Sequence, residues 1–181
     1  MKEIVPKTVM KDYFVQKASN YDEYNSFRKV FAYQYGTICA LHYVLGIETG
    51  LQNLSFDMKN GLIYVNSLKF NFEDSKASPF SLRLSRNLLT FLDKTLLNAC
   101  ILPAFSATID ALNNEKFNFK KYLQLMHKDL SVSFRSSKQE SFIAERLNDM
   151  NQNLDKVRKL IEAGELVSNC GEVPSHLKYW F

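Results

Sequence analysis

Residues 54–65 read LSFDMKNGLIYV, two short strand-like runs on either side of a turn that contains Asn60-Gly61. Both residues of an Asn-Gly pair tolerate positive φ, and such a pair between two strand-like runs is a strong signal for the tight turn of a β-hairpin. We therefore predict a hairpin in which the first strand begins at Leu54 and the second strand ends at Val65.

Helical patterns flank the hairpin on both sides. Before it, apolar residues between Asp22 and Leu45 recur at spacings of three, four and seven, which predicts one long helix with a buried stripe. The stripe consists of Phe27, Phe31, Ile38, Leu41 and Leu45, widened by Tyr33, Tyr35 and Tyr43. Further helices are expected over residues 9–16, 85–97, 102–112, 119–134 and 141–163. The predicted fold class is therefore α+β and mostly α-helical.

The composition is that of a folded protein without a nucleic-acid-binding patch. Of the 181 residues, 46% are hydrophobic and 23% are charged, and the net charge is +4. The densest basic segments, residues 116–121 and 156–159, are interleaved with apolar residues, so they indicate solvated helix faces. The cysteines Cys39, Cys100 and Cys170 have no metal-ligand spacing, so we predict no metal site.

No segment predicts passage through a membrane. The N-terminus lacks the uninterrupted apolar core of a signal peptide. The most apolar window, residues 88–112, is interrupted by Asp93, Lys94 and Pro103, so we expect no membrane span there. We expect a soluble nuclear or cytosolic protein. His42 lies among aromatic residues of the long helix and is predicted to be a core or boundary histidine.

The order of the elements, with a long helix, a loop, a hairpin and then helices, is that of the region around a kinase catalytic loop. Phosphoryl transfer needs an acidic residue that orients the acceptor, an Asn five positions later, and an Asp after the hairpin that holds the metal on the nucleotide phosphates. Here Glu48 stands five residues before Asn53, and Ser67 follows the hairpin. The neutral hydroxyl of Ser67 is a poor ligand for a hard cation, and the longer side chain of Glu48 would misplace its carboxylate. We therefore predict a degenerate site without a catalytic residue, metal, cofactor or nucleotide.

These residues resemble the phosphatidylinositol-3-kinase-related kinases. The family pattern runs Leu-Gly, Gly-Asp-Arg-His-x-x-Asn, Leu-x-x-Asp, Thr-Gly and Ile-Asp-Phe-Gly. From Asn53 onward the chain matches it without a gap, with Asp57 and Gly61 at the hairpin positions. The resemblance implies that Asn53 stands at the metal-Asn position and Ser67 at the metal-Asp position, while Thr49-Gly50 replaces the Arg-His pair. It also implies a kinase-like C-terminal lobe over residues 1–140.

Other stretches resemble the TRRAP-type pseudokinase branch of this family. FRKVFAYQ (residues 27–34) is similar to that branch's Phe-Arg-Lys-x-Phe-x-x-Gln, and LRLSRNL (residues 82–88) is similar to its Phe-Arg-Leu-Thr-Pro-Asn-Leu. The end of the chain resembles the short FATC module that closes these proteins. The residues that carry this likeness are Val157, Leu160, Ile161, Ala163, Trp180 and Phe181. The resemblance thus implies a helix and a helical FATC-like tail over residues 141–181.

By this resemblance the chain is expected to be a non-catalytic scaffold in a transcription coactivator subunit of histone acetyltransferase complexes. It would act in the nucleus through other protein subunits, without direct contact with nucleic acid, membrane or nucleotide. Two other functions stay open. One is a divergent remnant of an active kinase that transfers phosphate from ATP, with Glu48 and Asn53 still engaged. The other is an unrelated helical adaptor, which a structure without a hairpin at Leu54–Val65 beneath the long helix would favour.

Overall fold

The computed structural model describes residues 6–45, 54–57, 60–66, 86–114, 119, 121–122, 141–146 and 148. The elements are α1 (Val9–Lys17), α2 (Tyr21–Leu45), β1 (Leu54–Asp57), β2 (Leu62–Val65), α3 (Arg86–Leu96), the π-helical turn η2 (Leu97–Ile101) and α4 (Leu102–Asn113). Residues 141–146 are also helical. The mostly helical α+β class is therefore confirmed, and so are the long helix and the hairpin.

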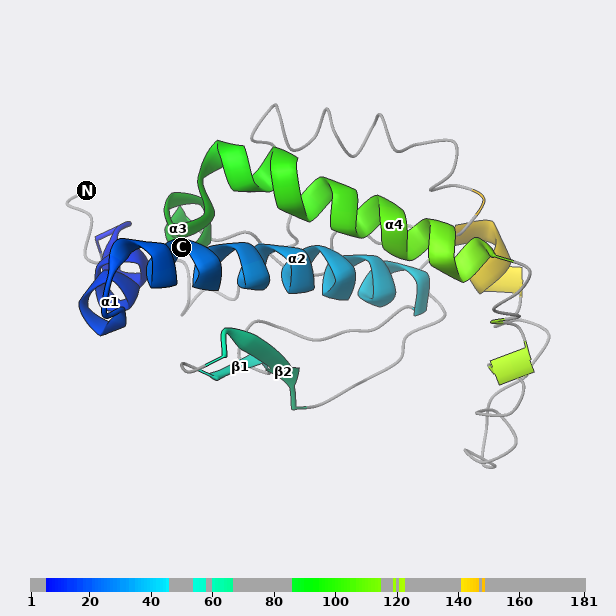
Figure 1. Cartoon of the computed structure of the whole chain (residues 1–181). Helices are drawn as coiled ribbons and strands as arrows, with labels where there is room; N and C mark the ends of the chain where they lie inside the picture. Colours follow the sequence, from blue (N-terminus) through cyan, green and yellow to red (C-terminus); the bar gives the residue numbers. More distant parts are fainter. Residues whose placement is uncertain are drawn as a thin grey trace, which may run out of the picture.

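Helix α2 is the centre of the fold (Figure 1). Helix α4 runs along one side of α2, the hairpin lies on another side, and α1 packs near its N-terminal end. Side chains from α2 and from the α3–α4 stretch fill the space between them. The largest that are fully buried are Tyr35, Phe31, Phe91, Phe105, Leu92, Ile101, Ile109, Val44 and Cys39. Helix α2 contacts α1, α3, η2, α4 and β2, so it is the element around which most of the described fold is arranged.

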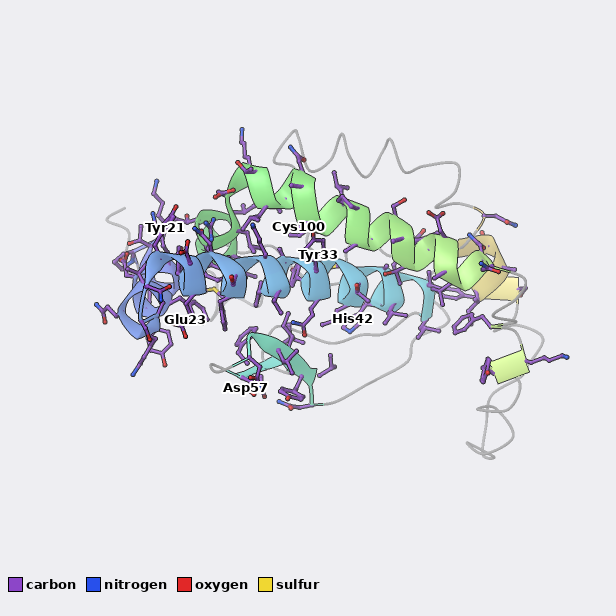
Figure 2. All side chains as sticks on the ribbon, viewed as in Figure 1. Tyr21, Glu23, Tyr33, His42, Asp57 and Cys100 are labelled. Carbon is purple, nitrogen blue, oxygen red and sulfur yellow. The ribbon has the colours of Figure 1, made fainter. Side chains whose placement is uncertain are left out.

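The buried side of α2 follows the predicted stripe with one correction. The predicted residues that are buried or packed against the core are Phe27, Phe31, Tyr35, Ile38, Leu41, Tyr43 and Leu45. Tyr33 is instead 49% exposed, so its place in the stripe was predicted wrongly. It lies at the edge of the contact between α2 and η2, where a hydrogen bond with Cys100 raises the pKa of Tyr33 (Figure 2). His42 is 2% exposed, which confirms a core histidine.

Helix α2 and the η2–α4 stretch approach closely at Gly36. A Cβ on Gly36 would lie 2.4 Å from the carbonyl oxygen of Ile101 and 3.1 Å from the Cβ of Ala104. A residue with any side chain would therefore force the two helices apart. The glycine allows the start of α4 to lie directly against the middle of α2.

The two helices predicted over residues 85–97 and 102–112 form one stretch, joined by η2. Pro103 lies in the turn that directly follows η2 and has no N–H to donate, so it interrupts the helical hydrogen-bond ladder where the π-helical turn ends. The stretch Asn87–Asn113 has 27 residues and contains an 18-residue window with a mean hydropathy of 1.4, so by length and composition alone it could cross a membrane. Here it places Phe105 and Ile109 in the core beside α2.

Helix α3 is broken at Asp93, which has φ 56° and ψ 171°, a conformation that is costly for any residue except glycine. Arg28 of α2 binds this break. Its Nε donates to the carbonyl oxygen of Phe91 (2.7 Å), and its Nη2 donates to the carbonyl oxygen of Leu92 (3.0 Å) and to the Asp93 carboxylate (2.5 Å). The other carboxylate oxygen of Asp93 accepts from the backbone N–H groups two and three residues further on, at 2.8 and 3.1 Å. Asp93 therefore caps the helical segment that follows it.

Candidate functional site

The hairpin that the predicted site residues flank has the predicted geometry. Strands β1 and β2 are antiparallel, with Leu54 opposite Val65. Gly61 has φ 69°, and its N–H donates to the carbonyl oxygen of Asp57 (2.8 Å). The Asn60 side chain donates to the Asp57 carboxylate (2.9 Å), which closes the turn. The Asn-Gly turn is confirmed, and the condition that would favour an unrelated helical adaptor is not met.

The three residues predicted to stand at degenerate kinase positions, Glu48, Asn53 and Ser67, lie outside the described residues, so their roles stay predictions. In the sequence, Asn53 immediately precedes Leu54 and Ser67 follows two residues after Val65. Leu54 and Val65 are paired, so the chain continues to both candidate positions from the same end of the hairpin. The position and tilt of the hairpin therefore decide where both segments begin.

Gln34 fastens the hairpin to α2 through its side-chain amide. Its Nε2 donates to the carbonyl oxygen of Gly61 (2.9 Å), and its Oε1 accepts from the N–H of Ile63 (2.9 Å). The same Nε2 lies 3.2 Å from the carbonyl oxygen of Val30 in its own helix. A carboxamide carries both a donor and an acceptor, so it can satisfy one backbone group of the turn and one of β2 at once.

Two phenylalanines in the same stretch of α2 complete the surface on which the hairpin packs. The Phe27 ring covers Gly61, where a Cβ would lie 3.1 Å from the ring. The Phe31 ring is fully buried, with its centroid 5.3 Å from that of Phe56. The segment of residues 27–34 therefore holds the hairpin and, through Arg28, the break in α3. The sequence pattern placed Phe27 and Phe31 in the buried stripe of the helix, but it predicted no contact of this segment with the hairpin or with α3.

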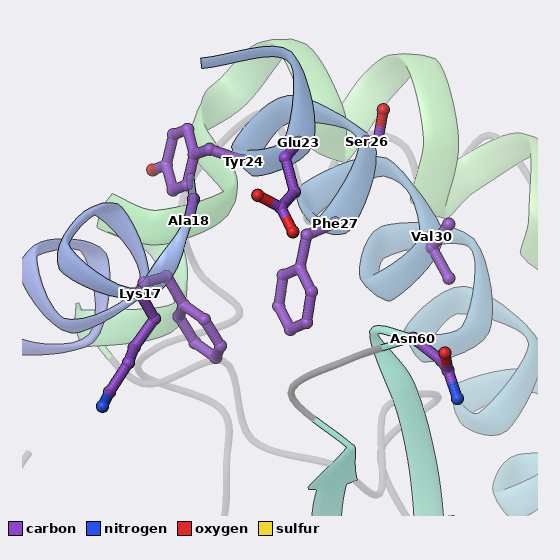
Figure 3. A pocket seen from close by; sticks show the side chains of 9 residues that line it. Lys17, Ala18, Glu23, Tyr24, Ser26, Phe27, Val30 and Asn60 are labelled. Atoms are coloured by element: carbon purple, nitrogen blue, oxygen red, sulfur yellow. The ribbon is translucent and has the colours of Figure 1, made fainter. Parts of the chain in front are cut away.

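A pocket of about 160 Å³ opens between α1, the N-terminal half of α2 and the hairpin turn (Figure 3). Phe14, Phe27 and Val30 form apolar walls, and Lys17 and Glu23 supply opposite charges. The pocket lies at the turn end of the hairpin, away from the end that leads to the kinase positions. In the part of the chain that the structure describes, no group of three or more His, Cys, Asp or Glu side chains is placed to hold a metal ion.

The helical segment 141–146 packs on the core around α2. Phe142 and Ile143 are buried in the same core cluster as α2. Arg146 is 5% exposed, with its guanidinium 4.4 Å from the ring centroid of Tyr43 and 4.9 Å from that of Phe142. Such cation–π contacts are strongest when they are shielded from water. The domain boundary between residues 140 and 141 stays a prediction, and so does the FATC-like tail, whose named residues lie outside the described ranges. Residues 141–146, at the start of the predicted second domain, nevertheless pack in the same core as the predicted first domain.

Comparison with known proteins gives the family. Residues 2–174 match the family described as phosphatidylinositol 3- and 4-kinase. The chain is also similar to the SAGA complex/NuA4 acetyltransferase complex subunit Tra1 of Schizosaccharomyces pombe, with 25% identity over 166 residues. That match covers 86% of this chain and 4% of Tra1, so the chain spans a small part of its relative. The chain belongs to the phosphatidylinositol 3- and 4-kinase family and is a TRRAP-type member of it.

Proposed function

We propose that this chain is a non-catalytic scaffold, part of the kinase-like C-terminal lobe of a TRRAP-like transcription coactivator subunit. The observation that carries the proposal is Ser67 at the position where the family has a metal-binding Asp. Catalysis of phosphoryl transfer depends on a metal ion that neutralises the developing charge, and a neutral hydroxyl cannot replace the carboxylate that holds it. Glu48 and Thr49-Gly50 are further departures in the same site.

The hairpin supports the alignment with the family pattern that puts Ser67 at the metal-Asp position. The family pattern has the hairpin between the metal Asn and the metal Asp, and β2 ends at Val65, two residues before Ser67. A slip of one residue in a strand exchanges its two faces. Ile63 is 9% exposed and Tyr64 is 50% exposed, so the two faces of β2 differ clearly and the register is well determined.

The similarity to Tra1 supports the kind of assembly. Tra1 is named as a subunit of the SAGA and NuA4 acetyltransferase complexes. We infer that this chain contributes to a histone acetyltransferase complex in the nucleus and acts through contacts with protein subunits. It needs no direct contact with nucleic acid, membrane or nucleotide for this function.

Nucleotide binding tests the proposal directly. The thermal unfolding of the full-length protein is measured with and without ATP and magnesium, for the wild type and for Asn53→Ala. We expect no stabilisation by the nucleotide in either protein. A ligand present at 100 times its Kd stabilises the state that binds it by about 2.7 kcal/mol, which is readily detected. Stabilisation of the wild type that is lost in Asn53→Ala would refute the scaffold and favour the divergent kinase.

The proposed assembly has its own test. The full-length protein is affinity-purified from cells as the wild type and as Ser67→Asp, and acetyltransferase subunits are measured in each sample. A scaffold retains these subunits equally in both samples, because Ser67 is not used for catalysis. Absence of acetyltransferase subunits from both samples would contradict the assembly, whatever the result of the nucleotide experiment.

A further inference from the structure

We propose that Gln34 is a positioning residue whose side-chain amide fixes where the hairpin sits on α2, and so where the chain continues to Asn53 and Ser67. The two hydrogen bonds to Gly61 and Ile63, both 2.9 Å, are the observations that carry this inference. The inference goes beyond the proposed function, because it holds whether or not the lobe binds a nucleotide.

The geometry of these two bonds is that of a neighbouring strand. The Gly61 carbonyl lies in the turn and the Ile63 N–H two residues further on in β2, and one residue of a parallel strand binds such a pair with its own N–H and C=O. Gln34 supplies the same donor and acceptor from a helix. The amide therefore specifies both the place along β2 and the orientation of its edge.

The apolar contacts of the hairpin do not specify its place in this way. Phe31 packs against Phe56, and Ile63 is buried, but burial of apolar surface is non-directional, so these contacts select the face of the hairpin that meets α2 rather than its exact place along the helix. Hydrogen bonds weaken steeply with distance and angle, so they fix a position that apolar contacts only stabilise. Gln34 is itself held by α2, because its Nε2 also lies within reach of the Val30 carbonyl. The hairpin is thus tied to the longest helix of the described fold.

Two substitutions separate the positioning role from a general loss of packing. Gln34→Met keeps the length of the side chain but removes the donor and the acceptor. Gln34→Glu keeps the acceptor for Ile63, and when ionised it places a negative charge against the Gly61 carbonyl. When protonated, the introduced carboxyl group regains a donor and so reproduces the carboxamide. Thr37→Val is the matched control, because Thr37 bonds only to the Tyr33 carbonyl of its own helix among the contacts described (3.1 Å).

Amide hydrogen exchange of the 181-residue chain is measured for each variant relative to the wild type at the same pH. At pH 7 we expect the amides of β1 and β2 to exchange about 10- to 100-fold faster in both Gln34 variants, while α4 amides change much less. In Gln34→Glu the hairpin protection should return as pH falls through the raised pKa of the introduced carboxyl, whose ordinary value is about 4.3. Gln34→Met should show no such return, and Thr37→Val should match the wild type.

A distance measurement tests the consequence for the kinase positions. Spin labels are attached at Asn53→Cys and Ser67→Cys in a Cys170→Ser background, where Cys39 and Cys100 are buried. We expect the distribution of distances between the labels to broaden in Gln34→Met and to stay unchanged in Thr37→Val. Equal acceleration of hairpin and α4 exchange, protection in Gln34→Glu that does not depend on pH, or an unchanged distribution would each overturn the proposal.

Discussion

Arg28 of α2 holds the break in α3 at Asp93, because its guanidinium binds the Asp93 carboxylate together with the two carbonyl groups that precede it. The guanidinium also lies 5.3 Å from the ring centroid of Tyr24 and 6.0 Å from that of Phe91. Partial burial raises the pKa of Asp93, but the hydrogen bonds from Arg28 and from backbone N–H groups outweigh it, so the pKa lies below its ordinary value. A strained backbone conformation is thus stabilised by an ionised pair.

Removal of the guanidinium should destabilise the chain strongly. For Arg28→Met we expect the free energy of unfolding to fall by about 2 kcal/mol, because two part-buried carbonyl groups lose a charged donor, while the ion pair with the 47% exposed Asp93 contributes little. Arg28→Lys should lie between this variant and the wild type, since one ammonium cannot reproduce the fork of donors. Urea denaturation followed by circular dichroism measures both. Lys29→Met, at the exposed neighbouring position, is the control, and an equal loss there would show that Arg28 has no special role.

Gly36→Ala should destabilise the fold although alanine favours helices. In an exposed helix this change gains about 1 kcal/mol. Here the new Cβ would lie 2.4 Å from the Ile101 carbonyl oxygen, so the helices must separate, and we expect a net loss of about 2 kcal/mol. Thermal denaturation decides the sign. The exposed Ser26→Ala should change stability by less than about 0.5 kcal/mol, and a stabilised Gly36→Ala would contradict the close approach of the helices.

Gly61→Ala should weaken the hairpin for two separable reasons. The residue has φ 69°, which is strained for alanine, and the new Cβ would lie 3.1 Å from the Phe27 ring. We expect a loss of about 1 to 2 kcal/mol, measured by urea denaturation. A double-mutant cycle with Phe27→Leu separates the two causes, because only the steric part is relieved by the smaller side chain. Coupling close to zero would show that the ring does not restrict this position.

His42 should make the fold less stable in mild acid. Burial lowers the pKa of His42 from 6.5 to about 4, so the folded state disfavours the charged ring. The stability is fully present above pH 6.5 and declines as pH falls towards 4, because only the unfolded chain binds the proton readily. The difference between the pKa of His42 in the unfolded and folded states corresponds to about 3 kcal/mol in the free energy of unfolding. Urea denaturation between pH 7.5 and 4 measures the decline, and His42→Gln should flatten it relative to the wild type. Parallel curves for the two proteins would assign the decline to other groups.

Local chemistry predicted the elements that depend on neighbours in sequence. Asn60-Gly61 predicted the turn, and regular apolar spacing predicted α2 almost to its ends. The break at Asp93 could not be predicted in this way, because its stabilising partner Arg28 is 65 residues away. Gly36 did carry a signal, since an isolated glycine inside a helical pattern often marks a close contact.

The site was predictable only as a set of positions. The family pattern assigned Glu48, Asn53 and Ser67 from their spacing in the sequence. The family pattern did not predict which contact positions the hairpin between Asn53 and Ser67. That contact is the Gln34 amide, which binds backbone groups that are present whatever the sequence. A bond to the backbone requires no particular residue type at the partner position, so the sequence carries no sign of it. Only the three-dimensional structure shows that the two segments are in contact.

The binding of backbone groups by side chains of α2 also affects which positions of this lobe can change in evolution. Gln34 and Arg28 bind the backbone of residues 61, 63, 91 and 92, so these hydrogen bonds do not depend on which apolar side chain fills the core at Ile63, Phe91 or Leu92. The reverse does not hold, because few other side chains offer the same donors in the same reach. If selection preserves the shape of the lobe but not its chemistry, residues 27–36 of α2 should therefore be the most conserved. The loops that would carry catalytic residues in an enzyme should be much less conserved.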